Sequence, residues 1–379
     1  MNTSCVDDHS SRYQVECFHS IKDMPERFTP LFEQASQDSL FYSRHWFYLL
    51  EQSIFHSSVR VFTVSLNDAS PLLILPCYET KQGTQLHALS NYYSALYKPL
   101  CHPSYPHMVA VFDALIREIN RHHYQRICLS AMSKDKVYER LQQRFSYHAY
   151  MTKSFFCFGN WYEPIETPVF TDYLSHRPSQ LRNTLRRKAK KLTDHRIVIS
   201  SEPKEIQRLF PHYQAIYAKS WKGDEAYPDF IEEMVFSLAQ KGVMRVAIAY
   251  IANKPAAAQL WMVTKSREQR CAQSNAVASI YKLAYDPHFK NSSIGSILTA
   301  AMFKHVIEQD RVSKIDYLSG DDAYKKDWMS YRNERWGLLM YNKRTFKGFF
   351  LGLVSLIFRT IKKKLKVLKR AFFSLKERV

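Results

Sequence analysis

Apolar and polar residues follow two alternating periods along the chain, which predict alternating helices and strands. In the first half, three- and four-residue spacing predicts helices, and short apolar runs predict strands. The helices are expected at 28–36, 44–53 and 107–123, and the strands at 58–66, 71–78, 126–131 and 154–161. The second half repeats this order. Its helices are expected at 203–220, 229–241, 293–309 and 323–330, and its strands at 243–252, 256–264, 277–285, 314–318 and 336–341. The pattern predicts one α/β plan used twice.

A tight turn shows how the second sheet is built. Only Asn253-Lys254-Pro255 separates two consecutive strands, which predicts an antiparallel hairpin. Neither a helical bundle nor a doubly wound, all-parallel nucleotide fold accommodates this hairpin, so we expect mixed sheets. The Pro-rich segment 163–168 is a plausible join between the halves. We therefore expect a flexible N-terminus at 1–9, domains at 10–165 and 166–345, and a separate helix at 346–379.

The net charge of +19 is concentrated in two segments. Seven basic residues and no acidic ones lie between Arg177 and Thr193, and twelve basic residues accompany one glutamate between Lys343 and Val379. The rest of the chain is nearly neutral. A protein that binds DNA through a generally basic surface is therefore not indicated.

The C-terminal segment has an apolar stripe with helical spacing. The stripe consists of Phe350, Val354, Ile357, Ile361, Leu365, Leu368, Phe372 and Leu375. Lysines occupy the other faces, a pattern typical of helices that lie on an anionic membrane surface. A terminal helix that packs on its own domain, or one that binds a partner, are the alternatives. The longest apolar stretch, 349–358, has ten residues, about half of what a membrane-spanning helix needs.

The remaining composition favours the cytoplasm. Seven scattered cysteines without a CxxC pair argue for reduced thiols, and neither they nor the histidines show metal-ligand spacing. The first thirty residues contain no apolar run, so we expect no signal peptide. Combined with the C-terminal stripe, this predicts a cytoplasmic protein held peripherally on the inner membrane face.

The inner basic segment also reads as a helix. Leu181 and Leu185 lie on one face, and Arg182 and Arg186 lie on another. Closely spaced arginines are suited to phosphate groups of a cofactor, an anionic substrate, a nucleic acid or a lipid. A solvated helix face is the alternative.

Three stretches together resemble a known family. They are RPSQLRNTLRRKAKKL (177–192), YQAIYAKSWKGDEAYPDF (213–230) and IYKLAYDPHFKNSSIGSILTAAMFKHVI (280–307), the last running on to IDYLSGDDAYKKDWM (315–329). In wording and order they resemble the tandem acetyltransferase-fold proteins of the CelD/BioF2-like group, relatives of the FemAB peptidyltransferases. The resemblance implies two GNAT folds, an acyl-CoA or aminoacyl donor, and an amine acceptor, often in envelope polysaccharide or lipid pathways.

A donor site is expected where the helix at 293–309 begins. Unpaired N–H groups at a helix start, with a glycine that allows close approach, suit the pyrophosphate of acetyl-CoA or another acyl-CoA. The resemblance places a Gly-containing phosphate loop here, in shortened form. The expected donor-binding residues are Ser292, Ser293, Gly295 and Ser296, with Arg182 and Arg186. A serine cap on an ordinary helix is the alternative.

Carboxylates follow the strand at 314–318. Adjacent carboxylates repel, which raises one pKa toward that of a general base. We expect Asp316, Asp321 or Asp322 to deprotonate the acceptor amine. The resemblance implies that Tyr324 protonates the departing thiolate. Alternatively, the two adjacent aspartates cap a helix.

Acceptor-binding residues are expected nearby. They are Trp221, Tyr227, Gln259 and Trp261, lining a groove between the halves, and Lys325 in the carboxylate segment. Gln259 stands where GNAT enzymes often have a glutamate, and an amide cannot act as a base. For each tryptophan, packing in the core or at its rim is the alternative.

The sequence thus predicts an N-acyltransferase that moves an acyl group directly from acyl-CoA, with acetyl-CoA the expected donor, to an amine. The acceptor is expected to be a small molecule, lipid or sugar in envelope polysaccharide or lipid biosynthesis. One alternative is a FemAB-like transferase that uses aminoacyl-tRNA. The other is a non-catalytic, membrane-associated scaffold of degenerate GNAT fold.

Overall fold

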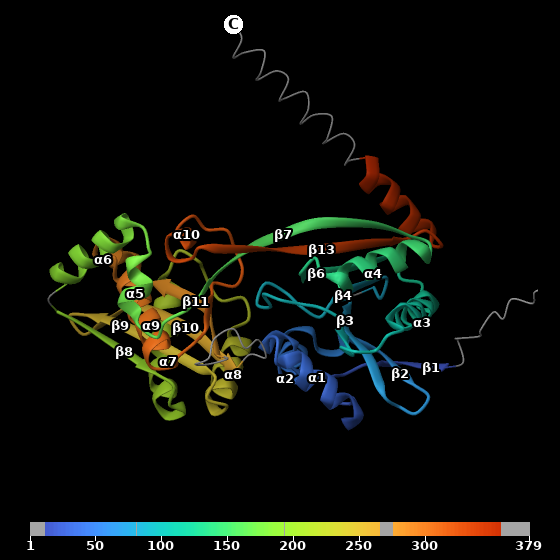
Figure 1. Ribbon diagram of the computed structural model, residues 1–379, viewed down its shortest axis with the longest axis horizontal. Coiled ribbons are helices and arrows are strands. Elements are labelled where there is room, and N and C mark those ends of the chain that lie inside the picture. Colours follow the sequence, from blue (N-terminus) through green and yellow to red (C-terminus); the bar gives the residue numbers. More distant parts are fainter. Residues whose placement is uncertain (1–11, 81, 193, 266–275, 358–379) are drawn as a thin grey trace, which may run out of the picture. The chain divides into compact units, whose positions relative to one another are not determined.

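The computed structural model describes residues 12–80, 82–192, 194–265 and 276–357 (Figure 1). The chain forms two compact units that interleave along the sequence. Unit 1 comprises Met1–Leu31, Ser57–Cys157 and Trp336–Val379, and unit 2 comprises Phe32–His56 and Phe158–Arg335. The expected N-terminal segment 1–9 lies outside the described residues.

Unit 1 contains a mixed sheet. Its strands lie in the order β1 (Tyr13–Phe18), β2 (Val59–Leu66), β3 (Pro71–Glu79), β4 (Gln85–Ala88), β6 (Arg126–Met132) and the second half of β13 (Tyr331–Asn342), while β5 (Leu100–Cys101) pairs with β3. β4 and β6 are parallel, and the other described pairs are antiparallel. The helices are η2 (Glu26–Phe28), α3 (Met108–Arg121), α4 (Lys136–Tyr147) and one over 346–357.

Unit 2 contains a second mixed sheet. Its strands lie in the order of the end of β7 (Tyr150–Pro164), β12 (Lys314–Asp316), β11 (Ala276–Tyr285), β10 (Lys254–Lys265), β9 (Met244–Ile251) and β8 (His195–Ser200). β11 and β12 are parallel, and the other described pairs are antiparallel. The sequence therefore correctly predicts a mixed α/β protein.

Helices cover the sheet of unit 2. They are α2 (Arg44–Leu50), α5 (Phe170–Ser175), α6 (Ser179–Lys191), α7 (Pro203–Lys219), α8 (Pro228–Gln240), α9 (Ile294–Glu308) and α10 (Lys325–Trp328), with η3 (Leu40–Tyr42), η4 (Glu51–Phe55) and η6 (Pro287–Ser292). α9 packs on β9–β11 and contacts α5 and α6, and α7 packs on the same strands and contacts α8. α1 (Thr29–Ser36) and η5 (His56–Ser58) lie where the chain passes between units.

Each unit receives its last paired strand from the other half of the sequence. Residues Trp336–Tyr341 of β13 pair with β6 in unit 1, and residues Tyr162–Pro164 of β7 pair with β12 in unit 2. The chain therefore passes between the two units within these strands, after Cys157 in β7 and after Arg335 in β13. The domain limits 10–165 and 166–345 remain predictions.

The predicted hairpin is confirmed, with its turn one position earlier. Ile251 pairs with Lys254, so Ala252 and Asn253 alone form the turn. Both have positive φ, 48° and 59°, as a two-residue hairpin of this twist requires. Lys254 and Pro255 already belong to β10.

The C-terminal helix is present over 346–357, and the rest of the predicted helix, 358–379, lies outside the described residues. Among the helices of the described ranges, none combines the length and the apolar character needed to cross a membrane.

Candidate functional site

The first turn of α9 leaves two backbone donors open. Ser293, with φ of 58°, joins η6 to α9, and the Ile294 N–H donates to Ser292 Oγ at 3.2 Å. The Ile297 N–H donates to the Ser293 carbonyl at 3.1 Å. Within the described residues, the N–H groups of Gly295 and Ser296 have no hydrogen-bond acceptor. These two donors, at the positive end of a helix dipole, form a place for an anion.

Gln259 and Trp261, on β10, are connected to this turn by hydrogen bonds. Gln259 Nε2 donates to Thr299 Oγ1 at 2.8 Å, and Thr299 Oγ1 donates to the Gly295 carbonyl at 2.9 Å. Trp261 Nε1 donates to Gln259 Oε1 at 2.8 Å. The prediction that Gln259 and Trp261 line a groove is wrong. Both are buried in the core of unit 2, because β10 is a central strand whose residues at these positions face α9.

The basic helix α6 lies beside the start of α9. Lys188 Nζ donates to the Asn291 carbonyl at 2.6 Å, so one cation of α6 reaches the end of η6. Arg182 and Arg186 are exposed on the same helix, and Arg186 Nη2 contacts Asn183 Oδ1. The sequence analysis omits Lys188 from the donor site, although it belongs to the same basic run.

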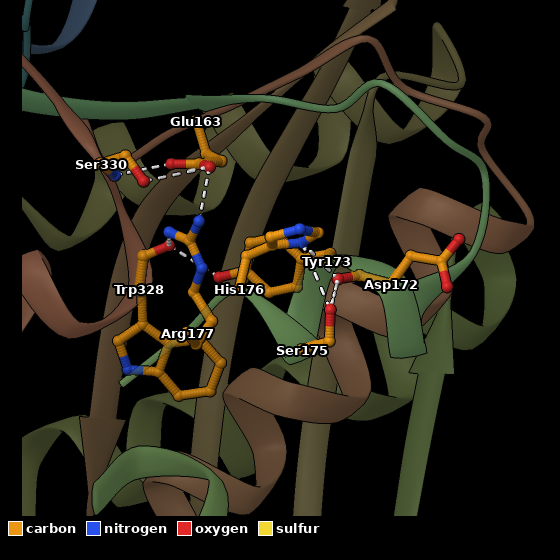
Figure 2. A network of polar contacts seen from close by, with 8 residues as sticks. All are labelled: Glu163, Asp172, Tyr173, Ser175, His176, Arg177, Trp328 and Ser330. Atoms are coloured by element: carbon orange, nitrogen blue, oxygen red, sulfur yellow. Dashed lines mark hydrogen bonds and ion pairs between the residues drawn. The ribbon is translucent and has the colours of Figure 1, made fainter. Parts of the chain in front are cut away.

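Arg177 does not belong to this basic surface. It is buried, and its Nη2 donates to Glu163 Oε1 at 2.7 Å while its Nη1 donates to the Trp328 carbonyl at 3.1 Å (Figure 2). The Ser330 N–H donates to Glu163 Oε2 at 2.6 Å. These groups border a cavity of about 440 Å³ in unit 2. Since Arg177 and Glu163 neutralise each other, we interpret this network as structural.

Asp316 is also engaged in structure. It is buried, and its Oδ1 accepts from Asn160 Nδ2 at 2.5 Å and from the Leu318 N–H at 2.8 Å. Its Oδ2 lies 3.1 Å from Lys314 Nζ. A carboxylate with these donors in place is poorly suited to take a proton from an acceptor.

The neighbouring carboxylates of Asp321 and Asp322 have different partners. Asp321 accepts from Arg332 Nε at 2.8 Å and Nη2 at 2.6 Å, and from Trp161 Nε1 at 3.1 Å. The Arg332 hydrogen bonds lower the pKa of Asp321, which outweighs the effect of desolvation. The expectation that mutual repulsion raises a pKa is therefore wrong for Asp321. The side chain of Asp322 is 60% exposed, and its Oδ2 lies 3.5 Å from Lys325 Nζ.

Tyr324 and Lys325 begin α10. Desolvation first, and then the Asp322 charge, raise the pKa of Tyr324 to about 12, so the phenol keeps its proton at neutral pH. Lys325 is buried, and its Nζ donates to the Ser319 carbonyl at 2.5 Å. Desolvation lowers the pKa of Lys325, whereas Asp322 acts in the opposite direction.

Lys222, Lys282 and Lys325 form a lysine cluster in unit 2. Lys282 Nζ donates to both oxygens of Glu225, at 2.9 and 3.0 Å. Desolvation, followed by the charges of Lys282 and Lys325, lowers the pKa of Lys222 to about 8. Glu225 pairs with Lys282 and Asp322 lies beside Lys325, so among the described residues Lys222 is the ammonium group of this cluster that has no paired carboxylate and is available to an anion.

An aromatic contact connects the two ends of the site. Trp221, which is 60% exposed, lies against Tyr285 with ring centroids 4.7 Å apart. Tyr285 in turn lies beside Gly295, since a Cβ on that glycine would be 3.6 Å from Tyr285 Cδ1. Lys222 follows Trp221 directly. Tyr227, the N-cap of α8, is partly exposed beyond this loop.

The structure thus brings together the α9 turn, Trp221 and the lysine cluster with Asp322 and Tyr324. Sequence reasoning missed Lys222, Lys282 and Glu225. All three lie inside the stretches that carry the family resemblance, which was the available signal.

Known proteins support the fold. Residues 179–326 match the family described as "Acetyltransferase (GNAT) domain". The structure of FemX aligns over 86% of this chain and 97% of its own, with 10% identity and a TM-score of 0.56. The C-terminal domain of a putative lysylphosphatidylglycerol synthetase from Agrobacterium fabrum aligns over 86% and 94%, with 14% identity and a TM-score of 0.52.

A tandem GNAT protein from the clavulanic acid biosynthesis pathway aligns over 86% of this chain and 98% of its own, with 9% identity and a TM-score of 0.51. No curated protein matches the chain significantly. The likeness to solved structures concerns the fold, and the family match covers the segment that holds both the α9 turn and the lysine cluster. Residues 179–326 are therefore similar to the acetyltransferase (GNAT) domain family, and the chain has the fold of FemX and of a tandem GNAT protein.

Proposed function

We propose that the protein is an N-acyltransferase that moves an acyl group from acyl-CoA, with acetyl-CoA the expected donor, to an amine. The observation that carries this proposal is the contact of Trp221 with Tyr285, and of Tyr285 with Gly295. It joins a helix start with two open N–H donors to a cluster of lysines and carboxylates. A donor and an acceptor bound at these two ends would meet beside one aromatic wall.

The residues at the donor end suit a pyrophosphate. The N–H groups of Gly295 and Ser296 supply neutral donors, and Lys188 supplies a cation next to them. Arg182 and Arg186 extend the positive surface of α6 for further phosphate oxygens. CoA-type donors carry both a pyrophosphate and a thioester. The pyrophosphate would bind at the start of α9, and the thioester would lie toward the lysine cluster.

Asp322 is the best-placed base among the three predicted aspartates, because Asp316 and Asp321 are held by other donors. Asp322 takes a proton from the acceptor ammonium, and the freed amine forms an N–C bond with the thioester carbonyl. The C–S bond then breaks, and Tyr324 gives its proton to the departing thiolate. Its raised pKa of about 12 keeps that proton available at neutral pH.

The lysine cluster supports an acceptor that carries an anionic group. A bound phosphate or carboxylate would offset the desolvation and the neighbouring ammonium charges that together lower the pKa of Lys222. Sugar or lipid amines of envelope polysaccharide and lipid biosynthesis include such anionic acceptors, in agreement with the family resemblance. The fold neighbours FemX and the putative lysylphosphatidylglycerol synthetase support the same setting.

Calorimetry with CoA, acetyl-CoA and longer acyl-CoAs tests the donor. We expect saturable binding of acetyl-CoA to the wild-type protein and loss of that binding in Gly295→Val, with Gln207→Val, at an exposed position of α7, as the control for a valine placed in a helix. Failure of every CoA derivative to bind would refute the proposal. Binding of aminoacyl-tRNA in its place would support the FemAB-like alternative, and binding of neither would support a scaffold.

A further inference from the structure

The C-terminal helix over 346–357 has one face pressed against unit 1. Gly348 and Gly352 are buried, and a Cβ on Gly348 would lie 2.6 Å from the Gln125 carbonyl oxygen. A Cβ on Gly352 would overlap the Met151 side chain. One turn later, Lys153 Nζ donates to Ser355 Oγ at 3.0 Å. Since the helix backbone is in direct contact with the rest of unit 1, the rotation of the helix about its axis is fixed.

The opposite face of this helix carries large apolar side chains. They follow the i, i+4, i+7, i+11 spacing of a single helix face and are exposed, from 83% at Phe346 to 40% at Leu353. We name this the apolar face; it consists of Phe346, Phe350, Leu353 and Ile357. Phe349 and Leu356 extend it on one side and are also exposed. Such a continuous exposed apolar surface marks an interaction site.

Positive charge lies at the start of the apolar face. Lys343, Arg344 and Lys347 are exposed at the start of the helix. The following 22 residues, 358–379, lie outside the described part of the chain, but their sequence contains nine basic residues and one acidic residue. A partner that binds this surface must therefore offer both apolar groups and negative charge.

We propose that the apolar face inserts into the headgroup region of a bilayer that contains anionic lipid. Because Gly348 and Gly352 pack against the rest of unit 1, Phe346 and Phe350 point away from it. Their side chains can therefore enter the region between the lipid headgroups and acyl chains without any rearrangement of unit 1. Lys343, Arg344 and Lys347 then lie at the level of the lipid phosphates. A second copy of the chain is a poorer occupant, because two equally cationic helices repel each other.

Sedimentation of the full-length protein with vesicles tests this proposal. We expect binding to vesicles of phosphatidylcholine mixed with phosphatidylglycerol, and little binding to phosphatidylcholine alone. The triple variant Phe346→Ser, Phe350→Ser, Leu353→Ser should reduce the vesicle affinity about tenfold or more, because three apolar side chains no longer enter the lipid. Tyr147→Ser, at another exposed aromatic residue of unit 1, is the matched control and should bind as the wild type does.

Two results would overturn the proposal. One is wild-type affinity of the triple variant, provided that its melting temperature shows that it is folded. The other is a wild-type protein that does not bind the anionic vesicles but sediments as a dimer which the triple variant abolishes, since the apolar face would then be a contact between copies. Acyl-CoA binding by the triple variant is expected to stay unchanged, so a failure of lipid binding is distinct from a failure of the transferase proposal.

Discussion

Trp221 lies against Tyr285 with ring centroids 4.7 Å apart and ring planes inclined by 46°. The two residues come from separate segments, the loop after α7 and the end of β11. Because Trp221 remains largely exposed, this contact contributes less to the core than to the surface beside Gly295. An exposed tryptophan that is held in place by a partner is suited to bind a ligand.

The first prediction is that Trp221→Ala weakens substrate binding without destabilising the fold. Loss of the aromatic surface should raise KM about tenfold, whereas the free energy of unfolding should change by less than about 1 kcal/mol, since the side chain is exposed. Steady-state kinetics and chemical denaturation measure the two effects. Trp221→Phe keeps a ring on Tyr285 and should retain most of the affinity. A large loss of stability in the alanine variant would instead make Trp221 a packing residue.

A second prediction separates the adjacent aspartates. Asp322→Asn should lower kcat about 100-fold or more, because a general base typically contributes that much. Asp321→Asn loses charge in a pair with Arg332 that is partly exposed, so it should cost at most about 1 kcal/mol of stability and change kcat little. Single-turnover rates and thermal melts measure both. If Asp321→Asn abolished turnover and Asp322→Asn did not, the assignment of the base would be reversed.

The third prediction concerns pH. The pKa of Lys222 is lowered to about 8, so its ammonium form, which attracts an anion, is lost as the pH rises through 8. The affinity for an anionic acceptor should therefore fall above pH 8, and Lys222→Met should remove this inflection. Calorimetry with inorganic phosphate on either side of pH 8 measures it. Lys219→Met, a nearby exposed lysine paired with Asp286, should leave the inflection in place. A pH profile that Lys222→Met does not change would exclude Lys222 from the anion site.

A fourth prediction tests the close approach at α9. In Gly295→Ala the new methyl group would make an ordinary contact 3.6 Å from Tyr285, and alanine favours the helix by up to about 1 kcal/mol. Stability should therefore stay equal or rise, while the affinity for acetyl-CoA falls because the methyl group stands beside the open N–H groups. We therefore expect Gly295→Ala to leave stability equal or higher and to lower the affinity for acetyl-CoA. Unchanged acetyl-CoA affinity would place the pyrophosphate elsewhere.

The fifth prediction concerns Arg177, which is buried with Glu163 rather than displayed on α6. Arg177→Leu leaves the Glu163 carboxylate buried without its cation and should cost about 3 to 5 kcal/mol of stability. Glu163→Gln replaces the carboxylate with an amide of the same shape and should lower the stability by less, about 1 to 3 kcal/mol. Denaturant titration of the two variants gives these values. A stable Arg177→Leu protein with weakened CoA binding would return Arg177 to the ligand surface.

Local patterns predicted most of the fold. The apolar periods located β9, β10 and α9 to within two residues, because these elements are long and strongly periodic. The edge strand β8 was missed, since its sequence HRIVIS has a run of only three apolar residues between polar ones. β1 was missed for a similar reason, because charged and polar residues interrupt YQVECF.

The site was predictable only where its chemistry is local. The open donors of Gly295 and Ser296 belong to one helix start, which a sequence displays directly. Strand order is not local, so nothing in the sequence shows that β10 is central and that Gln259 and Trp261 are buried. The partner of Asp321, Arg332, lies on the next strand along the chain, and the three lysines of the cluster come from three separate segments. Their meeting depends on the tertiary fold.

The pairing of β13 with β6 has a consequence for biosynthesis. As the chain leaves the ribosome, β1 to β6 appear within the first 132 residues, but the strand that covers the edge of β6 follows only at Trp336–Tyr341. Throughout that interval the edge of β6 displays unpaired backbone groups, which invite pairing with another nascent chain. Unit 1 is thus completed late in translation, and a message truncated near codon 335 would yield a product prone to aggregation rather than a free-standing N-terminal half.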